Sequence, residues 1–468
     1  MQTIKNIKIE AIADDHSASI LDGQSRICNW LYNHLLDYAI EQKKQFIATG
    51  DSECAKTVYT KRGLRNHIPV LKETQHFLKS VHSSPLKNVG LRLSSAIQAH
   101  QKAKKGKRKG KAGWPKFRAW SAHWFSLFYD EPQKGFKISE DTLKLSLGAD
   151  QEGKRLSCQL RLKEHHLLGN HEIRNLRLIK ESGKFYVICA VAITLLETQA
   201  IKNIIAIDPN HKNFGVGIDT QGTCIEIASP TWLKVYDKRI DELKSKRDRC
   251  QKHAKILPVM DLQGNSTDKT YTIPSKNWTK RNRALQYTFY KRREQTKTFM
   301  YTIANRLCST YDCIAIGDYI PHGEGINIKM RRAMNNRSLI GRFKEIVSWT
   351  AKKLGKTYIE YEETNTTREC SSCGYRNPTG LHPSIRMWQC PECQAIHMRD
   401  ENAAQNGLKK VLRDFREKYE TIVSSVSGSD LVPVLEQWAW RVLPSRVITT
   451  LRGQNGMKMQ RQEIKLEA

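Results

Sequence analysis

The hydrophobic pattern changes twice along the first 200 residues. Residues 2–10 alternate polar and apolar side chains, which predicts a β-strand. From about Ser17 to His100 the apolar positions, among them Leu31 and Leu35, recur at helical spacing, so we expect a helical lobe there. From about Trp124 to Thr198 short alternating segments are separated by turns, and a small antiparallel barrel fits them best.

A different organisation begins at Ile204, where a short apolar strand ends in Asp208. Further strands and long helices then alternate, and acidic residues stand at strand ends, which predicts an α/β nuclease-type core. The expected elements are a hairpin partner at 214–219, helices at about 231–254, 280–309 and 339–354, and strands at 313–316 and 357–363.

The composition narrows the range of possible functions. The chain has 468 residues, and its 78 Lys and Arg against 47 Asp and Glu give a net charge of +31, which suits a polyanionic partner such as nucleic acid. Hydrophobic residues at 39% still allow folded cores, and the length predicts more than one domain. The longest apolar run, residues 188–196, is about half of what a membrane span needs. Without a secretion signal at the N-terminus, we expect a protein inside the cell.

The run from Lys102 to Arg118 holds nine cations and three glycines without an acid. It is either a solvated basic linker or a phosphate clamp. Trp114, Phe117 and Trp120 lie within or beside it, and interleaved aromatic and basic residues favour contact with nucleic acid.

Four of the twelve cysteines form two CxxC pairs, separated by sixteen residues: Cys370 with Cys373, and Cys390 with Cys393. This spacing lets two thiolate hairpins close a tetrahedral zinc site. Four thiolates leave no open position for water, so the predicted role is structural. The alternative, four unrelated thiols, explains the spacing less well.

Two aspartates stand where a metal-dependent nuclease needs them. Phosphodiester cleavage by paired divalent ions requires several carboxylates to converge on the metals. Asp208 ends an apolar strand, and Asp400 follows the zinc motif directly at the start of a predicted helix. Taken alone, Asp208 could be a turn residue and Asp400 a helix N-cap.

Several motifs together resemble, in order and spacing, the transposon-encoded TnpB family, which is related to the miniature type V CRISPR effectors. They are Ile207-Asp-Pro-Asn-His-Lys-Asn-Phe-Gly215, Ser275-Lys-Asn-Trp-Thr-Lys280, Thr366-Thr-Arg-Glu-Cys-Ser-Ser-Cys-Gly374 and Arg399-Asp-Glu-Asn-Ala-Ala404. The resemblance is strongest from about 201 to 412 and continues more weakly back to residues 113–118.

The resemblance implies a multidomain α+β protein that uses a structured guide RNA and a short target-adjacent motif to cleave double-stranded DNA. The implied parts are a wedge-type β-barrel (1–16 and 106–200), a helical recognition lobe (17–105), a RuvC-like RNase H core (201–364 and 398–412), a zinc-ribbon insert that binds target nucleic acid (365–397) and a variable C-terminal tail (413–468). No membrane partner is expected, the location is cytoplasmic at a prokaryotic nucleoid, and a homodimer stays open.

By position, Asp208 and Asp400 match the first and last RuvC aspartates, which would hold Mg²⁺. The family's usual glutamate position, however, is occupied by Gly317. One explanation is relocation to Glu363 at the end of the next strand, because neighbouring strands lie only about 5 Å apart. Glu362, Asp318 and Glu324 are weaker substitutes.

The other explanation is loss of cleavage, which leaves an RNA-guided DNA-binding protein that acts by occupancy. A generic zinc-ribbon nucleic-acid chaperone is a third reading. It does not account for Asp208 and Asp400 in matching contexts. We expect the cations of the basic run and of the helix after 275 to contact nucleic acid: Lys104, Lys105, Lys107, Arg108, Lys109, Lys111, Trp114, Lys116, Arg118, Lys276 and Lys280.

Overall fold

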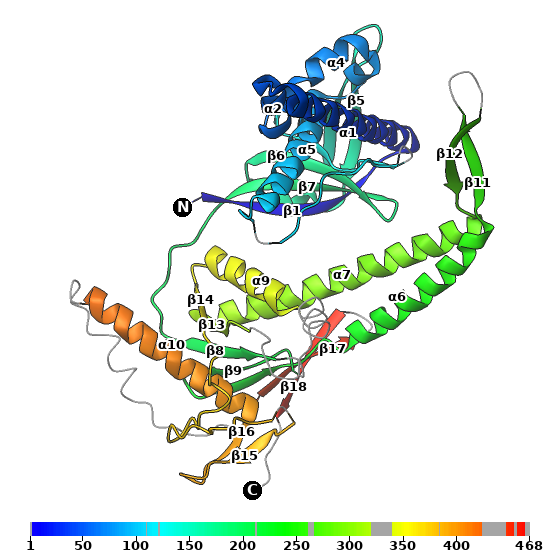
Figure 1. Ribbon diagram of the computed structural model, residues 1–468. Helices are drawn as coiled ribbons and strands as arrows, with labels where there is room; N and C mark the ends of the chain where they lie inside the picture. Colours follow the sequence, from blue (N-terminus) through cyan, green and yellow to red (C-terminus); the bar gives the residue numbers. More distant parts are fainter. Residues whose placement is uncertain are drawn as a thin grey trace. The chain divides into compact units, whose positions relative to one another are not determined.

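The computed structural model describes residues 2–108, 110–119, 122–210, 213–260, 266–319, 339–382, 384–423, 446–453 and 456–463. The chain divides into two compact units, Met1–Thr194 and Leu195–Ala468 (Figure 1). None of the helices in the described ranges is long and apolar enough to cross a membrane.

The helices of the N-terminal unit follow its first strand. The long helix α1 begins after Asp14, whose side chain accepts a hydrogen bond from the Ser17 amide, and ends at Gly50 in the left-handed conformation. Leu31 and Leu35 are fully buried on its inner face, as the helical spacing predicts. The helices are α1 Asp15–Thr49, α2 Ser52–Tyr59, α3 Gly63–Asn66, α4 Ile68–Thr74, the 3₁₀ turn His76–Ser80 and α5 Ser83–Lys104.

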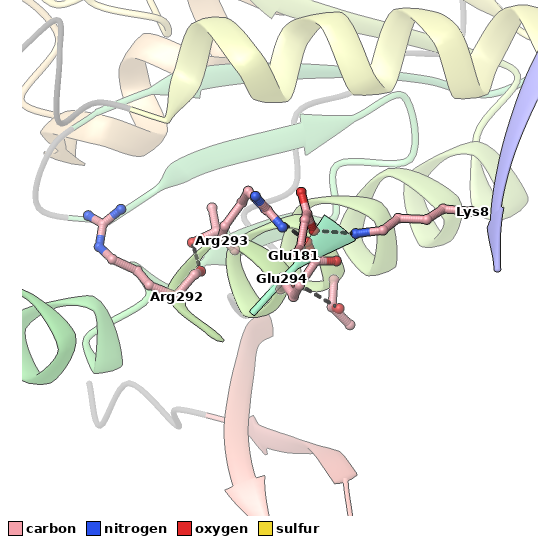
Figure 2. Close-up of polar contacts among 7 residues, drawn as sticks. Lys8, Glu181, Arg292, Arg293 and Glu294 are labelled. Carbon is pink, nitrogen blue, oxygen red and sulfur yellow. Dashed lines mark hydrogen bonds and ion pairs between the residues drawn. The ribbon is translucent and has the colours of Figure 1, made fainter. Parts of the chain in front are cut away.

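The same unit contains a seven-stranded antiparallel sheet in the order β2-β6-β7-β1-β5-β4-β3. Lys8 on β1 reaches over the Tyr186 ring on β7 and pairs with Glu181 on β6 at 2.7 Å (Figure 2). The described pairings leave β2 and β3 at the two edges, so closure into a barrel stays a prediction. The strands are β1 Gln2–Ile12, β2 Leu127–Tyr129, β3 Phe136–Ser139, β4 Thr142–Ala149, β5 Arg155–Leu162, β6 Ile173–Glu181 and β7 Lys184–Thr194.

The C-terminal unit is built on a mixed sheet in the order β14-β13-β8-β9-β10-β17-β18. Strands β8, β13 and β14 run parallel, so their carboxyl ends lie at one edge of the sheet. The strands are β8 Ile204–Pro209, β9 Gly215–Asp219, β10 Cys224–Ile227, β13 Cys313–Gly317, β14 Thr357–Tyr361, β17 Arg446–Gly453 and β18 Gly456–Glu463.

Helices cover both faces of this sheet (Figure 1). Ile205 and Ile314 pack with α7 Lys276–Thr310 and α9 Ile340–Lys353 on one face, and Ala206 and Ala315 pack with α10 Arg399–Val423 on the other. The short strands β15 Met387–Gln389 and β16 Ile396–Met398 belong to the cysteine-rich segment before α10. The alternation of strands and helices confirms the mixed α/β prediction for this half of the chain.

Three features differ from the sequence expectation. The hairpin of β11 Lys255–Met260 and β12 Ser266–Ile273, which lies between α6 Trp232–Arg249 and α7, was not predicted. Helix α10 continues to Val423, beyond the expected boundary at 412. In the expected tail, β17 pairs in parallel with β10, a contact between residues far apart in sequence that no local pattern reveals.

Candidate active site and metal centre

The predicted carboxylates come from the carboxyl-terminal edge of the parallel strands and from the start of α10. Asp208 is the last residue but one of β8 and is only 7% exposed. Glu363 lies two residues beyond the end of β14, and Asp400 lies in the first turn of α10. The fold therefore brings residues separated by almost 200 positions to one edge of one sheet.

Gly317 makes room for Glu363. Strand β13 pairs with β14 so that Gly317 faces Tyr361, and the chain then carries Glu363 back over the glycine. A Cβ atom at position 317 would lie 2.6 Å from Glu363 Cγ and closer still to Oε1, so any other residue would displace this side chain. The Glu363 carboxylate thus fills the space in which a side chain from residue 317 would stand.

A buried lysine holds the turn after β13. Lys344 on α9 is 8% exposed, and its Nζ donates to the Asp318 carbonyl oxygen at 3.0 Å and to Glu360 Oε2 at 2.8 Å. The Glu363 amide donates to Asp318 Oδ1 at 3.2 Å, and the Asp318 amide donates to the Tyr361 carbonyl oxygen at 2.9 Å. Asp318 is therefore engaged in supporting the Glu363 backbone.

Burial and like charge perturb the carboxylates. Burial first, and then the Glu363 and Asp400 carboxylates, raise the pKa of Asp208 well above its usual value. Burial, followed by the charge of Asp318, raises the pKa of Glu363 to about 7. Such shifts arise where like charges converge in a desolvated site, an arrangement that a divalent cation would relieve.

Tyr361 ties two elements of the site together. This residue is 4% exposed, and its hydroxyl donates to the Ile207 carbonyl oxygen at 3.0 Å, directly before Asp208. A Cβ atom at Gly407 of α10 would lie 2.5 Å from the Tyr361 hydroxyl oxygen. The glycine therefore lets the tyrosine ring fit between the end of β8 and α10.

Asp400 is already paired. Arg386 of the cysteine-rich segment donates from Nη1 to both carboxylate oxygens of Asp400, at 3.1 and 3.3 Å. The side chains are 38% and 19% exposed, so this ion pair is partly shielded from water. The sequence assigns no role to Arg386, and its link to Asp400 was not predicted.

The four predicted zinc ligands do come together. The Sγ atoms of Cys370, Cys373, Cys390 and Cys393 lie within 4.8 Å of one another, with Cys370–Cys393 and Cys373–Cys390 at 3.6 Å. His397 Nε2 lies 3.0 Å from Cys370 Sγ, a contact that the CxxC spacing did not indicate. The donor set and its closeness fit a tetrahedral Zn²⁺ site.

Two asparagines of α10 fasten this cysteine-rich segment to the core. Asn402 and Asn406, both nearly fully buried, each donate to the Glu369 carbonyl oxygen at 2.7 Å. Asn402 Oδ1 also accepts from the Ser371 amide at 2.8 Å. The helix that carries Asp400 and the metal-binding segment are therefore one hydrogen-bonded assembly.

The three carboxylates are less closely grouped for a divalent metal than the four cysteines are for Zn²⁺. Within the described residues, the four cysteines are the one group of at least three His, Cys, Asp or Glu residues placed closely enough to hold a metal ion, so Asp208, Glu363 and Asp400 do not form such a group. Glu363 Oε1 is nevertheless buried without a hydrogen-bond partner in the described part of the chain. A buried, unpartnered carboxylate oxygen beside two further carboxylates is a donor set that Mg²⁺ accepts.

Some of the residues predicted to contact nucleic acid are exposed, whereas others already contact groups of the protein. Trp114 is half-buried against the His100 ring and beneath Lys43, and Arg118 donates to Asn29 Oδ1 and the His123 carbonyl oxygen. These two residues therefore hold the linker against the helices. Exposed cations are Lys104, Lys105, Lys107, Arg108, Lys111, Lys116, Lys276 and Lys280, whereas Lys109 and the substitute Glu324 lie outside the described residues.

Comparisons with known proteins agree with the motifs. Residues 341–406, from α9 into α10, match the family model described as Cas12f1-like, TNB domain. The TnpB-like protein L79 of Acanthamoeba polyphaga mimivirus is 27% identical over 229 residues, which cover 45% of this chain and 38% of that protein. The CRISPR-associated DNA-binding protein Cas12m of Pelobacter propionicus is 30% identical over 126 residues, covering 24% and 18% of the two chains.

The fold also has a counterpart among solved structures. A Cas12f1–sgRNA–target DNA complex contains a chain that aligns with a TM-score of 0.52 at 12% identity, over 87% of this chain and 98% of that one. At this identity the likeness concerns the fold. The family model, the curated relatives and the fold together confirm the resemblance to TnpB proteins and miniature type V CRISPR effectors that the motifs indicate.

Proposed function

We propose that this protein is an RNA-guided DNA endonuclease with a single RuvC-like, Mg²⁺-dependent site formed by Asp208, Glu363 and Asp400. The observation that carries the proposal is the placement of Glu363 over Gly317. A chain that had merely lost its catalytic glutamate would have no reason to keep a buried carboxylate with one unpartnered oxygen in that space.

The carboxylates bind and orient the metal. When bound, Mg²⁺ supplies Lewis-acid stabilisation of the phosphate and lowers the pKa of a water nucleophile. Asp208 is held by β8, with Tyr361 fixing the preceding carbonyl group, and Glu363 is held by the hydrogen bond that its backbone N–H donates to Asp318 Oδ1. The raised pKa values mean that metal binding competes with protons for these two groups, and for Glu363 this competition falls near neutral pH.

The partners we propose are a structured guide RNA and a double-stranded DNA target, at a cytoplasmic site near the nucleoid. Support comes from the net charge of +31 and from the solved Cas12f1 complex, which contains sgRNA and target DNA. In this scheme the Zn²⁺-bound segment 365–397 contacts target nucleic acid, and base pairing with the guide selects the sequence. The exposed cations of the basic run and of early α7 contact phosphates.

A second candidate, guided DNA binding without cleavage, has its own support. One relative is described as a DNA-binding protein, and Arg386 occupies both oxygens of Asp400. If Arg386 stays in place when DNA binds, Asp400 cannot take up metal. The two candidates therefore differ in whether the Asp400 carboxylate becomes available.

The deciding experiment incubates the protein, co-expressed with the non-coding RNA beside its gene, with a plasmid library that carries a randomised target-adjacent motif. Wild type is compared with Asp208→Asn, Glu363→Gln and the control Glu362→Gln, which changes the exposed neighbour of Glu363. Mg²⁺-dependent cutting that the first two substitutions abolish and the third leaves intact is expected. Cutting that survives Glu363→Gln would contradict the relocated site, and guide-dependent retention of DNA without cutting would establish the second candidate.

A further inference from the structure

Two arginines flank one tryptophan in the N-terminal unit, and a third lies over a nearby phenylalanine. Arg92 lies on α5, Arg118 on the segment that leads into β2, and Arg177 on β6. The guanidinium carbons of Arg92 and Arg118 lie 4.8 and 5.0 Å from the centre of the Trp124 ring. That of Arg177 lies 5.0 Å from the centre of the Phe128 ring, directly across the β2–β6 pairing.

These guanidiniums lack acidic partners. In the described part of the chain none of the three forms an ion pair with a carboxylate. Arg118 donates to Asn29 Oδ1 at 2.5 Å, and Arg177 donates to Ser126 Oγ at 2.5 Å, which are both neutral acceptors. Because no negative charge is supplied, the three positive charges remain uncompensated.

The cations also lie close enough to oppose one another. Burial and then the charge of Arg118 lower the pKa of Arg92, and burial and then the charge of Arg92 lower that of Arg177. In addition, Trp124 is 7% exposed, and its indole N–H has no acceptor among the described residues. The cluster thus has a surplus of both positive charge and hydrogen-bond donors, while Arg92 keeps it open to solvent.

We propose that Arg92, Arg118 and Arg177 form a phosphate-binding site for the sugar–phosphate backbone of a bound nucleic acid. A phosphate group would neutralise the like charges, and the planar guanidinium fork matches its oxygens. Asn29 and Asn33 of α1 fix the backbone around Arg118, so this cation is positioned before the ligand arrives. The proposal rests on the proposed function in taking nucleic acid as the source of the phosphate, which RNA and duplex DNA share.

The test replaces the two arginines that do not fasten the linker. Full-length Arg92→Gln, Arg177→Gln and the double variant are compared with wild type and with Arg155→Gln, an exposed arginine on β5 of the same sheet. Binding of a labelled structured RNA and of a labelled DNA duplex of mixed sequence is measured over a range of salt concentrations. Thermal unfolding of each free protein is recorded in parallel.

The double variant should bind more weakly, and its plot of log K against log salt should be less steep by about 1 to 2. Each phosphate contact that is lost removes about one of the counterions that binding releases. Its melting temperature should stay the same or rise, because like-charge repulsion is removed, whereas a purely structural cluster would make it fall. Reduced slopes with RNA alone or with DNA alone identify the source of the phosphate. Unchanged slopes, or a fall in melting temperature equal to that of a packing mutant such as Trp124→Ala, would overturn the site.

Failure of this site is distinguishable from failure of the proposed function. If wild type binds both nucleic acids and all variants match it, the arginine site is wrong and the proposed nuclease is unaffected. If wild type binds neither RNA nor DNA, the proposed function itself fails.

Discussion

Substitution of Glu363 should change how the metal-free protein responds to pH. Folding raises the pKa of this carboxyl from 4.5 to about 7, mainly because it is buried and then because Asp318 is near. A carboxyl whose pKa is higher in the folded than in the unfolded state stabilises the folded protein in its protonated form. This contribution is complete below pH 4.5 and is lost as the pH rises through about 7. A shift of this size corresponds to at most about 3 kcal/mol.

The Glu363→Gln variant has no such titration, so its stability relative to wild type should rise by up to about 3 kcal/mol between pH 5 and pH 8. Coupling to Asp208 acts in the same direction, because the substitution also removes one cause of the raised Asp208 pKa. Thermal and denaturant unfolding would be followed in Mg²⁺-free buffer with zinc retained. Glu362→Gln, at an exposed site, serves as the control.

Saturating Mg²⁺ provides the second half of the test. The metal should stabilise wild type at pH 8 and stabilise Glu363→Gln much less, because a ligand that binds the folded state adds RT ln(1 + [Mg²⁺]/Kd). A stability difference that is flat from pH 5 to pH 8, or equal stabilisation of both proteins by Mg²⁺, would refute the assignment of Glu363 to a desolvated metal site.

Three further outcomes are expected. Lys344→Met should lower the free energy of unfolding by about 1–3 kcal/mol and reduce cleavage, because the Asp318 carbonyl group loses a charged donor; Lys352→Met, at an exposed position on α9, is the control. Gly407→Ala should cost about 1–3 kcal/mol in denaturant unfolding because its Cβ would collide with the ring and hydroxyl of Tyr361, and the same substitution should cost less in a Tyr361→Leu background, which lacks both; an equal cost in the two backgrounds would contradict the contact. Cys390→Ser should lower the zinc content measured by atomic absorption and open 365–397 to proteolysis, and undiminished zinc would exclude Cys390 as a ligand.

Many elements of the C-terminal unit were predictable from the sequence because their signals lie within short stretches of neighbouring residues. Apolar runs that end in acids, such as Ile204–Asp208, correspond to β8, and the CxxC spacing anticipated four thiols in one place. The β-hairpin between α6 and α7 pairs a mostly apolar strand, whose Ile256 and Leu257 are exposed, with a mostly polar strand, and this pattern does not follow the alternation of buried and exposed positions that predicts a strand. The parallel pairing of β10 with β17 joins segments more than 200 residues apart, which no window of sequence can reveal.

The supporting contacts of the site were beyond prediction for the same reason. Lys344 looks like one more cation on a basic helix, and only the packing of α9 shows that it is buried against the Asp318 carbonyl group. Arg386 and Asp400 are fourteen positions apart, across the zinc segment, and their pairing depends on how that segment folds. A motif indicates which residue types could be catalytic, whereas the residues that orient them are identified only by tertiary contacts.

Moving a carboxylate from one strand to its neighbour is therefore more than a single substitution. Gly317 has to lack a side chain for Glu363 to lie above it, and Gly407 has to lack one for Tyr361 to pack under the end of β8. Restoring a glutamate at position 317 alone would force two carboxylates into one buried space, where like charge and overlap both oppose folding. The pair Gly317→Glu with Glu363→Gly removes both objections. If the site works through carboxylate position rather than residue identity, the double substitution should retain more Mg²⁺-dependent stabilisation than either single change.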